Sequence, residues 1–190
     1  MNVSQTAEER LAFAGLTPEV RALLPELFQI LEGELPGILD RFYDHLDRWP
    51  ALAPLLSGHG KVESLKQVQS AHWRLMFSGR FDAEYFERAT AIGRAHQRIR
   101  LAPHWYIGGY TFLLSEVLAV LTTRYRHSPE KLERAVDAAA RTLLFDMELA
   151  TSVYIASDQS ALIRATILAT SPTAPAAPSM LEERSRAAKR

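Results

Sequence analysis

Apolar residues recur three and four positions apart through most of this chain, and no other feature constrains its fold as strongly. The segment KVESLKQVQSAHWRLMF at 61–77 shows the pattern, with Val62, Leu65, Val68 and Met76 on one side of a helix. No convincing run alternates between apolar and polar residues with turn residues at its ends, as a half-buried strand does. The sequence therefore predicts an all-α fold.

Capping residues, glycines and prolines divide this pattern into separate helices. Thr17 precedes Pro18, the usual order of an N-cap and a first helical residue, and Asp82 can cap the following helix. The predicted helices cover about 17–33, 34–48, 61–77, 82–101, 104–125 and 129–170. The segment TSPTAPAAPS is too rich in proline to pack, and it predicts a flexible linker over 170–190 after a domain over 1–169.

Composition excludes several classes of function. The 22 basic and 22 acidic side chains balance, so nothing favours nucleic acid or an anionic membrane surface as a partner. The absence of cysteine excludes disulfides, thiolate nucleophiles, cysteine zinc sites and thiolate-ligated haem. The start MNVSQTAEERLAFAG has no signal-peptide core, and Ser115 and Glu116 interrupt the most apolar run. We expect a cytoplasmic protein without a membrane-spanning segment.

The last two predicted helices are apolar on more than one face. Apolar residues surround most of the helix over 104–125, and Leu143, Leu144, Met147 and Ala150 lie on different sides of the last helix. A helix buried on several sides usually contacts a partner as well as its own core. The pattern favours a homodimer through these two helices, with a long helix crossing a monomeric core as the alternative.

One histidine lies on an apolar helix face. Tyr85, Ala89, Ile92, His96 and Ile99 follow one another at steps of four, three, four and three residues, so the side chain of His96 points where the others do. Burying an imidazole without a partner costs about 1–3 kcal/mol, so a backbone carbonyl, a water or a metal ion is expected at its ring. From periodicity alone, a core histidine bonded to a carbonyl is the simplest interpretation.

Other histidines compete for the role of a ligand. His72 lies four residues after Val68 and four before Met76, so spacing does not separate it from His96. Solvation or capping accounts for the histidines expected in loops or at helix ends, which are His45, His59, His104 and His127. No HExxH or Glu-x-x-His motif indicates zinc or di-iron, and no nucleophile elbow indicates a serine hydrolase.

Bulky apolar and aromatic residues on several predicted helices could line a slot together with His96. They are Phe42, Tyr43, Leu65, Val68, Trp105 and Tyr106. A haem site requires such a set, because one imidazole ligates the iron, apolar groups exclude water and a donor on the opposite side selects among gases.

Three segments carry a resemblance to a known family: RFYDHL at 41–46, FSGRFDAEYF at 77–86 and AHQRIRLAPHWYIGGY at 95–110. The last is the most specific, because a histidine, Ile-x-Leu-x-Pro and an aromatic pair follow in one order and spacing. With these motifs, residues from about 5 to 165 resemble the sensor globin domain of the globin-coupled sensors. The resemblance implies a globin-like fold that lacks one of the usual short helices, has an extra N-terminal helix and long C-terminal helices, and binds haem b.

The resemblance also implies roles for single residues. His96 matches the proximal iron ligand, Tyr43 the distal tyrosine that hydrogen-bonds oxygen, and Leu65 an apolar distal gate. Together with the apolar residues identified above, the residues expected around the haem are Phe42, Val68, His72, Ile92, Ile99, Trp105 and Tyr106. The family commonly has glycine where this chain has Arg100, so a more solvated end of the proximal helix is expected. The pair Gly108-Gly109 either permits a close helix approach or has no special packing role.

The implied function is a haem-based sensor of oxygen, with carbon monoxide and nitric oxide as further candidate gases. Such a domain signals through its dimer interface to an output domain. This chain contains neither the nucleotide-binding motif nor the signalling repeat that an output domain would have. We therefore expect no enzymatic activity of the chain as it stands. Two alternatives stay open: a haem enzyme such as a nitric oxide dioxygenase, which needs an electron source, and a haem-free helical dimerisation module.

Overall fold

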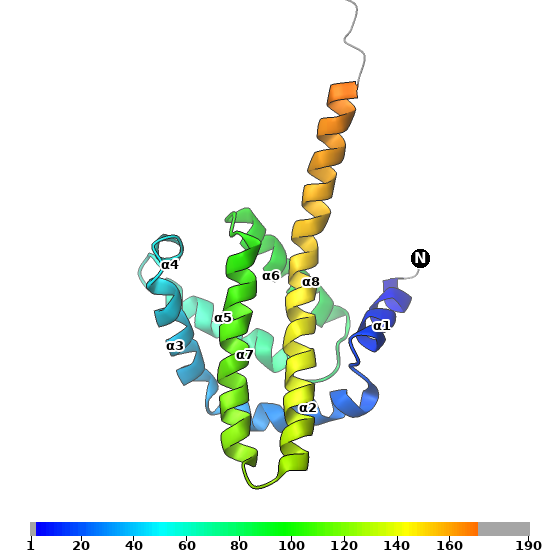
Figure 1. The fold of residues 1–190 in the computed structure, drawn as a ribbon. Helices are drawn as coiled ribbons and strands as arrows, with labels where there is room; N and C mark the ends of the chain where they lie inside the picture. Colours follow the sequence, from blue (N-terminus) through cyan, green and yellow to red (C-terminus); the bar gives the residue numbers. More distant parts are fainter. Residues whose placement is uncertain (1–2, 171–190) are drawn as a thin grey trace, which may run out of the picture. The chain divides into compact units, whose positions relative to one another are not determined.

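The computed structural model describes residues 3–170 of this chain, with side chains over 7–153. All regular elements in that range are helices, which confirms the all-α prediction (Figure 1). They are α1 (Val3–Phe13), α2 (Pro18–Glu32), α3 (Leu35–Asp47), α4 (Ala53–Leu56), α5 (Lys61–Met76), α6 (Ala83–Arg98), α7 (Pro103–Tyr125) and α8 (Pro129–Thr170).

Contacts divide the chain into two units, Met1–Ile155 and Ala156–Arg190. The described part of the second unit, residues 156–170, is the end of α8. The rest of the linker predicted over 170–190 lies outside the described residues, so the boundary between domain and linker stays a prediction.

Two of the predicted helix starts are confirmed by their caps. The Thr17 side chain accepts a hydrogen bond from the Val20 backbone nitrogen at 3.4 Å, and Asp82 accepts one from the Tyr85 nitrogen at 3.2 Å. Each bond satisfies one of the N–H groups that a helix start leaves without an intrahelical partner. The residue pattern does not predict α4, because a helix of 4 residues is too short to show periodicity.

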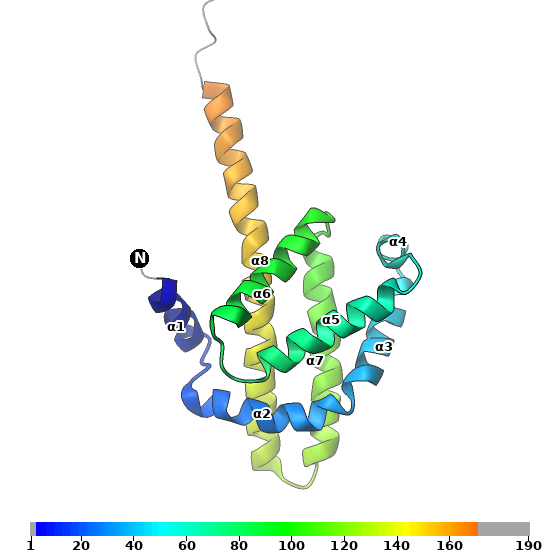
Figure 2. The same cartoon turned by 180° about the vertical axis from the view of Figure 1, so that it is seen from behind.

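The helices around the end of α6 form the framework of the candidate site. Helix α3 packs against α5 and α7, and α5 packs against α6. Within the first unit, α7 and α8 are joined by residues 126–128 and run antiparallel and side by side (Figure 1). The opposite view shows α5 and α6 in front of this pair (Figure 2). The core between these helices contains fully buried side chains, including Leu39, Met76, Tyr85, Val117 and Leu143.

Within the described residues, α7 is the single helix long and apolar enough to cross a membrane. Helices in the cores of soluble proteins pass the same test, and α7 buries Tyr106, Leu113, Val117, Leu121 and Tyr125 in the core. Other side chains of α7 are half-buried or exposed, so the helix also carries uncovered apolar surface. The cytoplasmic location stays a prediction.

Helices α6 and α8 approach closely at Gly93. A Cβ atom at this position would lie 2.4 Å from the carbonyl oxygen of Ala150 and 3.0 Å from its Cα atom. Both atoms belong to the backbone of α8, so they cannot turn aside as the end of a flexible side chain would. Glycine at 93 therefore sets how closely α6, with His96 one turn further on, packs against α8.

Candidate functional site

The end of α6 is closed by a Schellman motif that includes His96. The Arg100 nitrogen donates to the Gln97 carbonyl at 2.9 Å, and the Leu101 nitrogen donates to the His96 carbonyl at 3.1 Å. Arg100 has a φ of +55°, a left-handed conformation that glycine adopts without strain and that costs other residues about 1–2 kcal/mol. A glycine would therefore be the least strained residue at position 100. Arg100 adopts this backbone with its side chain exposed.

The imidazole of His96 is held through one nitrogen. Its Nδ1 lies 2.9 Å from the carbonyl oxygen of Ile92, and because a carbonyl can only accept, Nδ1 carries the proton. The other nitrogen, Nε2, then has the lone pair. Burial lowers the pKa of His96 and outweighs the hydrogen bond to Ile92, which raises it, so the neutral ring is favoured. A backbone partner and a metal ligand are thus compatible, because they use different nitrogens.

The first turn of α7 places two aromatic rings beside the end of α6. The ring of Tyr106 meets that of His96 edge-on, with centroids 4.8 Å apart and planes at 66°. The Tyr106 hydroxyl donates to the hydroxyl of Tyr110 at 3.3 Å. Trp105 packs instead against Trp49, with ring centroids 5.4 Å apart. Of this predicted pair, Tyr106 is the residue whose ring contacts the imidazole.

Tyr43 lies on α3 with its hydroxyl inside the protein. Its side chain is buried, and its hydroxyl donates to the side-chain oxygen of Gln69 on α5 at 3.0 Å. Burial raises the pKa of Tyr43 to about 12, so the hydroxyl keeps its proton at neutral pH and remains a donor. The ring of Phe42 packs edge-on against the ring of Tyr43, with ring centroids 5.3 Å apart. Gln69 is a neighbour that the sequence does not indicate, because only the packing of α3 on α5 brings it to Tyr43.

Two apolar side chains of α5 and the end of α6 are left uncovered. Val68 on α5 is 60% exposed and Ile99 at the end of α6 is 50% exposed, whereas Leu65 packs against the core. Large apolar surface of this kind commonly marks a binding site when it is clustered. Helix α5 contacts both α3 and α6, so the fold brings together the helices that carry Tyr43, Val68 and His96.

His72 belongs to a different cluster. Its ring is 5% exposed, its Nε2 lies 2.9 Å from a carboxylate oxygen of Asp146, and it stacks on Tyr85 with centroids 6.0 Å apart. Asp146 is a buried acid on α8 that helical periodicity alone does not indicate. Its position within Leu143–Ala150, an otherwise mostly apolar stretch, is the signal that could have identified it.

The two glycines early in α7 differ in their surroundings. A Cβ at Gly108 would meet no atom within 4 Å, and one at Gly109 would lie 3.5 Å from the ring of Phe42, an ordinary contact distance. Neither position therefore requires glycine for a close helix approach, in contrast to Gly93.

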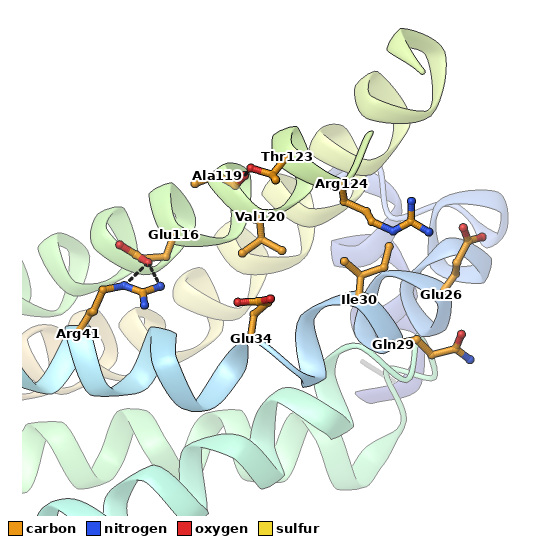
Figure 3. A pocket seen from close by; sticks show the side chains of 10 residues that line it. All are labelled: Glu26, Gln29, Ile30, Glu34, Arg41, Glu116, Ala119, Val120, Thr123 and Arg124. Carbon is orange, nitrogen blue, oxygen red and sulfur yellow. Dashed lines mark hydrogen bonds and ion pairs between the residues drawn. The ribbon is translucent and has the colours of Figure 1, made fainter. Parts of the chain in front are cut away.

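A separate pocket of about 750 Å³ lies between α2, α3 and α7 (Figure 3). Charged side chains line much of it, including Glu34, Arg41 and Glu116, and the Arg41 guanidinium donates to the Glu116 carboxylate at 2.9 Å. None of the predicted site residues lines this pocket. Its charged walls do not suit a flat apolar cofactor.

Comparisons with known proteins identify relatives of the chain. The family model described as Protoglobin matches residues 4–160. The heme-based aerotactic transducer HemAT of Halobacterium salinarum is 29% identical over an alignment of 157 residues, and the match covers 78% of this chain and 32% of that protein. The chain therefore spans about a third of the length of this relative.

Solved structures show the same fold. The globin domain of a globin-coupled sensor from Geobacter sulfurreducens superposes with a TM-score of 0.72 at 25% identity, covering 77% of this chain and 96% of that domain. The globin domain of E. coli DosC, in a ferric and a ferrous form, superposes with a TM-score of 0.65 at 17% identity, covering 75% of this chain and 97% of that domain. The globin-like fold class that the sequence predicts is thereby confirmed.

Proposed function

This chain belongs to the protoglobin family, and we propose that it is a haem-binding domain that senses oxygen or another diatomic gas. One observation carries the proposal: the His96 imidazole donates through Nδ1 to the Ile92 carbonyl and is favoured in its neutral form, which leaves Nε2 as a donor for iron. The printed descriptions of HemAT as a heme-based transducer and of the Geobacter domain as part of a sensor support the same function.

The residues around His96 fit a haem. An imidazole with a bonded Nδ1 is the usual form of a haem-ligating histidine, since the bond orients the ring and raises its basicity. Val68 and Ile99 offer uncovered apolar surface, and Phe42 and Tyr106 add aromatic walls. The chain has no cysteine for a covalent thioether attachment, so we propose haem b, which is held without such bonds.

The residues around the proposed haem would have different roles in gas binding. The haem supplies, when bound, an iron that takes up diatomic gases reversibly. The protonated hydroxyl of Tyr43 would stabilise oxygen by a hydrogen bond, for which it must release its bond to Gln69. Leu65 has no donor, so its role would be to exclude water by bulk. Carbon monoxide is less polar than oxygen and would gain less from Tyr43.

Tyr43→Phe is expected to speed the release of oxygen. The substitution keeps the ring and removes one hydrogen bond, worth about 1 kcal/mol, so the dissociation rate should rise about five-fold. Stopped-flow absorption measures this rate. Carbon monoxide is the internal control, because its release should change much less in the same protein. An oxygen dissociation rate equal to that of the parent would remove Tyr43 from this role.

We also propose that the domain forms a homodimer through α7 and α8. Ile107 on α7 is 45% exposed and Leu144 on α8 is 47% exposed, so both helices carry uncovered apolar side chains. A second copy would cover this surface with its own α7 and α8, as in other helical bundles. The prediction made from the sequence thus has uncovered apolar side chains in its support.

Leu144→Glu is expected to weaken the dimer about ten-fold or more, because burying an unpaired carboxylate costs well over about 1.4 kcal/mol. Sedimentation at several protein concentrations measures the dissociation constant. Phe13→Glu is the matched control, since Phe13 of α1 is 96% exposed and lies outside the last two helices. The dimer proposal fails if the parent protein is a monomer, or if both variants weaken association equally.

Absorption spectra of the purified protein test the proposed function directly. A Soret band that shifts when the reduced protein meets oxygen, carbon monoxide or nitric oxide is the expected result, and the relative affinities would identify the gas that it binds best. A protein without a Soret band would instead be a haem-free module. The expectation that this chain has no enzymatic activity stays a prediction, which an assay of nitric oxide consumption with an added electron donor would check.

A further inference from the structure

A buried carboxylate on α8 joins four helices. Asp146 is 2% exposed and accepts hydrogen bonds from Tyr85 of α6 at 2.9 Å and from Tyr110 of α7. Its two oxygens also lie 2.9 and 3.0 Å from Nε2 of His72 on α5, which acts as the donor because an ionised carboxylate only accepts. Burying a carboxylate is costly unless donors compensate, and here three helices each supply one.

The two tyrosines are permanent donors in this cluster. Burial, and then the negative charge of Asp146, raises the pKa of Tyr85 and of Tyr110 well above the usual range. Both hydroxyls therefore keep their protons under any ordinary condition. Stability alone does not account for such a cluster, because well-packed apolar residues in place of a buried ionic network are often equally stable.

Two hydrogen bonds and one ring contact connect Asp146 to His96. Tyr110 donates to Asp146, and Tyr106, one turn earlier on α7, donates to Tyr110 at 3.3 Å. The ring of Tyr106 in turn packs edge-on against the His96 imidazole. Hydrogen bonds in series polarise one another, so a change at one end of the chain alters the bonds at the other.

We propose that Asp146 is a positioning residue that couples α8 to the orientation of His96 through Tyr110 and Tyr106. The inference rests on the proposed function, because it concerns how a gas-binding site communicates with a helix of the expected dimer interface. A shift of His96 changes its contact with Tyr106, and the hydrogen bonds carry that change to α8. Since coupling between two sites is reciprocal, a change at Asp146 must also alter the site around His96.

The reciprocal effect is measured in the full, haem-loaded chain with two variants. Asp146→Asn keeps the shape of the side chain and loses one acceptor oxygen, and Tyr110→Phe removes only the hydroxyl between Asp146 and Tyr106. Both should shift the iron–histidine stretching frequency of the ferrous protein in the same direction. Both should also change the oxygen dissociation rate about two-fold or more. Should Asp146→Asn fail to fold, Tyr110→Phe decides the matter.

Tyr125→Phe is the matched control on the same helix. The Tyr125 hydroxyl donates to the carboxylate of Glu26 at 3.1 Å, and it lies outside the chain of groups that leads to His96. Its loss should leave the stretching frequency and the oxygen dissociation rate unchanged. Equal shifts in Tyr110→Phe and Tyr125→Phe, or an unchanged frequency in Tyr110→Phe, would overturn the proposal.

A second control separates positioning from stability. Tyr85→Phe removes a donor from Asp146 but leaves the bonds through Tyr110 and Tyr106 in place. It should lower the urea midpoint as much as Tyr110→Phe does and shift the stretching frequency less. If the two variants shift the frequency equally, the cluster acts only through stability and the positioning role is refuted.

Failure of the proposed function can be told apart from failure of the coupling, because the absence of a Soret band shows that haem is missing and does not depend on the role of Asp146. In such a protein the coupling is measured from the ring proton NMR signals of His96. Tyr110→Phe should move these signals and Tyr125→Phe should not. Signals that stay in place in Tyr110→Phe would refute the coupling in the haem-free protein as well.

Discussion

The His96→Ala protein is expected to purify without haem while its helices remain folded. His96 is the residue whose lone-pair nitrogen faces away from its backbone partner, since Nδ1 is committed to the Ile92 carbonyl. Removing groups that merely orient a metal ligand costs about 10–100-fold in affinity, so removing the ligand itself should cost more. Loss of the Soret band at unchanged far-ultraviolet circular dichroism is the measurement. Helicity should persist, because alanine is the strongest helix former and His96 is half-buried rather than fully buried.

Two controls make this result specific. His72→Gln should keep its haem, because the His72 ring is engaged with Asp146, although spacing alone made it an equal candidate. Imidazole added to His96→Ala should restore a Soret band by occupying the vacated position. A His96→Ala protein with the parent spectrum would refute the ligand assignment. Loss of haem in His72→Gln alone would transfer that role to His72.

Gly93→Ala is expected to destabilise the protein by about 1–3 kcal/mol or more, the usual cost of overpacking a tightly packed contact. The added methyl group would lie 2.4 Å from the Ala150 carbonyl oxygen, so α6 and α8 must separate. The sign of the change in the free energy of unfolding is informative, because replacing glycine by alanine within a helix otherwise stabilises a protein by about 1 kcal/mol. Urea unfolding followed by circular dichroism gives the free energy of unfolding.

Gly108→Ala is the matched control for this experiment. Gly108 is also inside a helix, and an added methyl group there would meet no atom within 4 Å. The same substitution should therefore stabilise the protein by about 1 kcal/mol at 108 and destabilise it at 93. Stabilisation at both positions would mean that α6 and α8 are not in close contact at Gly93.

Family membership and fold class follow from patterns that are local in the sequence. The helical spacing of apolar residues, the caps at Thr17 and Asp82, and the motif that begins at His96 depend only on neighbouring residues, and the structure and the comparisons confirm the all-α, globin-like fold and the family. The residues that share one face of a helix also follow from its sequence, which is why His96 could be placed on an apolar face. The roles of the individual site residues stay predictions.

What only the tertiary structure decided is which partner each polar group meets. His72 and His96 have equivalent spacings, yet one ring is bonded to Asp146, 74 positions away, and the other to a carbonyl of its own helix. The pairing of Tyr43 with Gln69 and the fit of Gly93 against Ala150 likewise depend on contacts between helices. Periodicity states which face of a helix is buried, but a hydrogen bond needs atoms about 3 Å apart, and only the packing of the whole chain determines such distances.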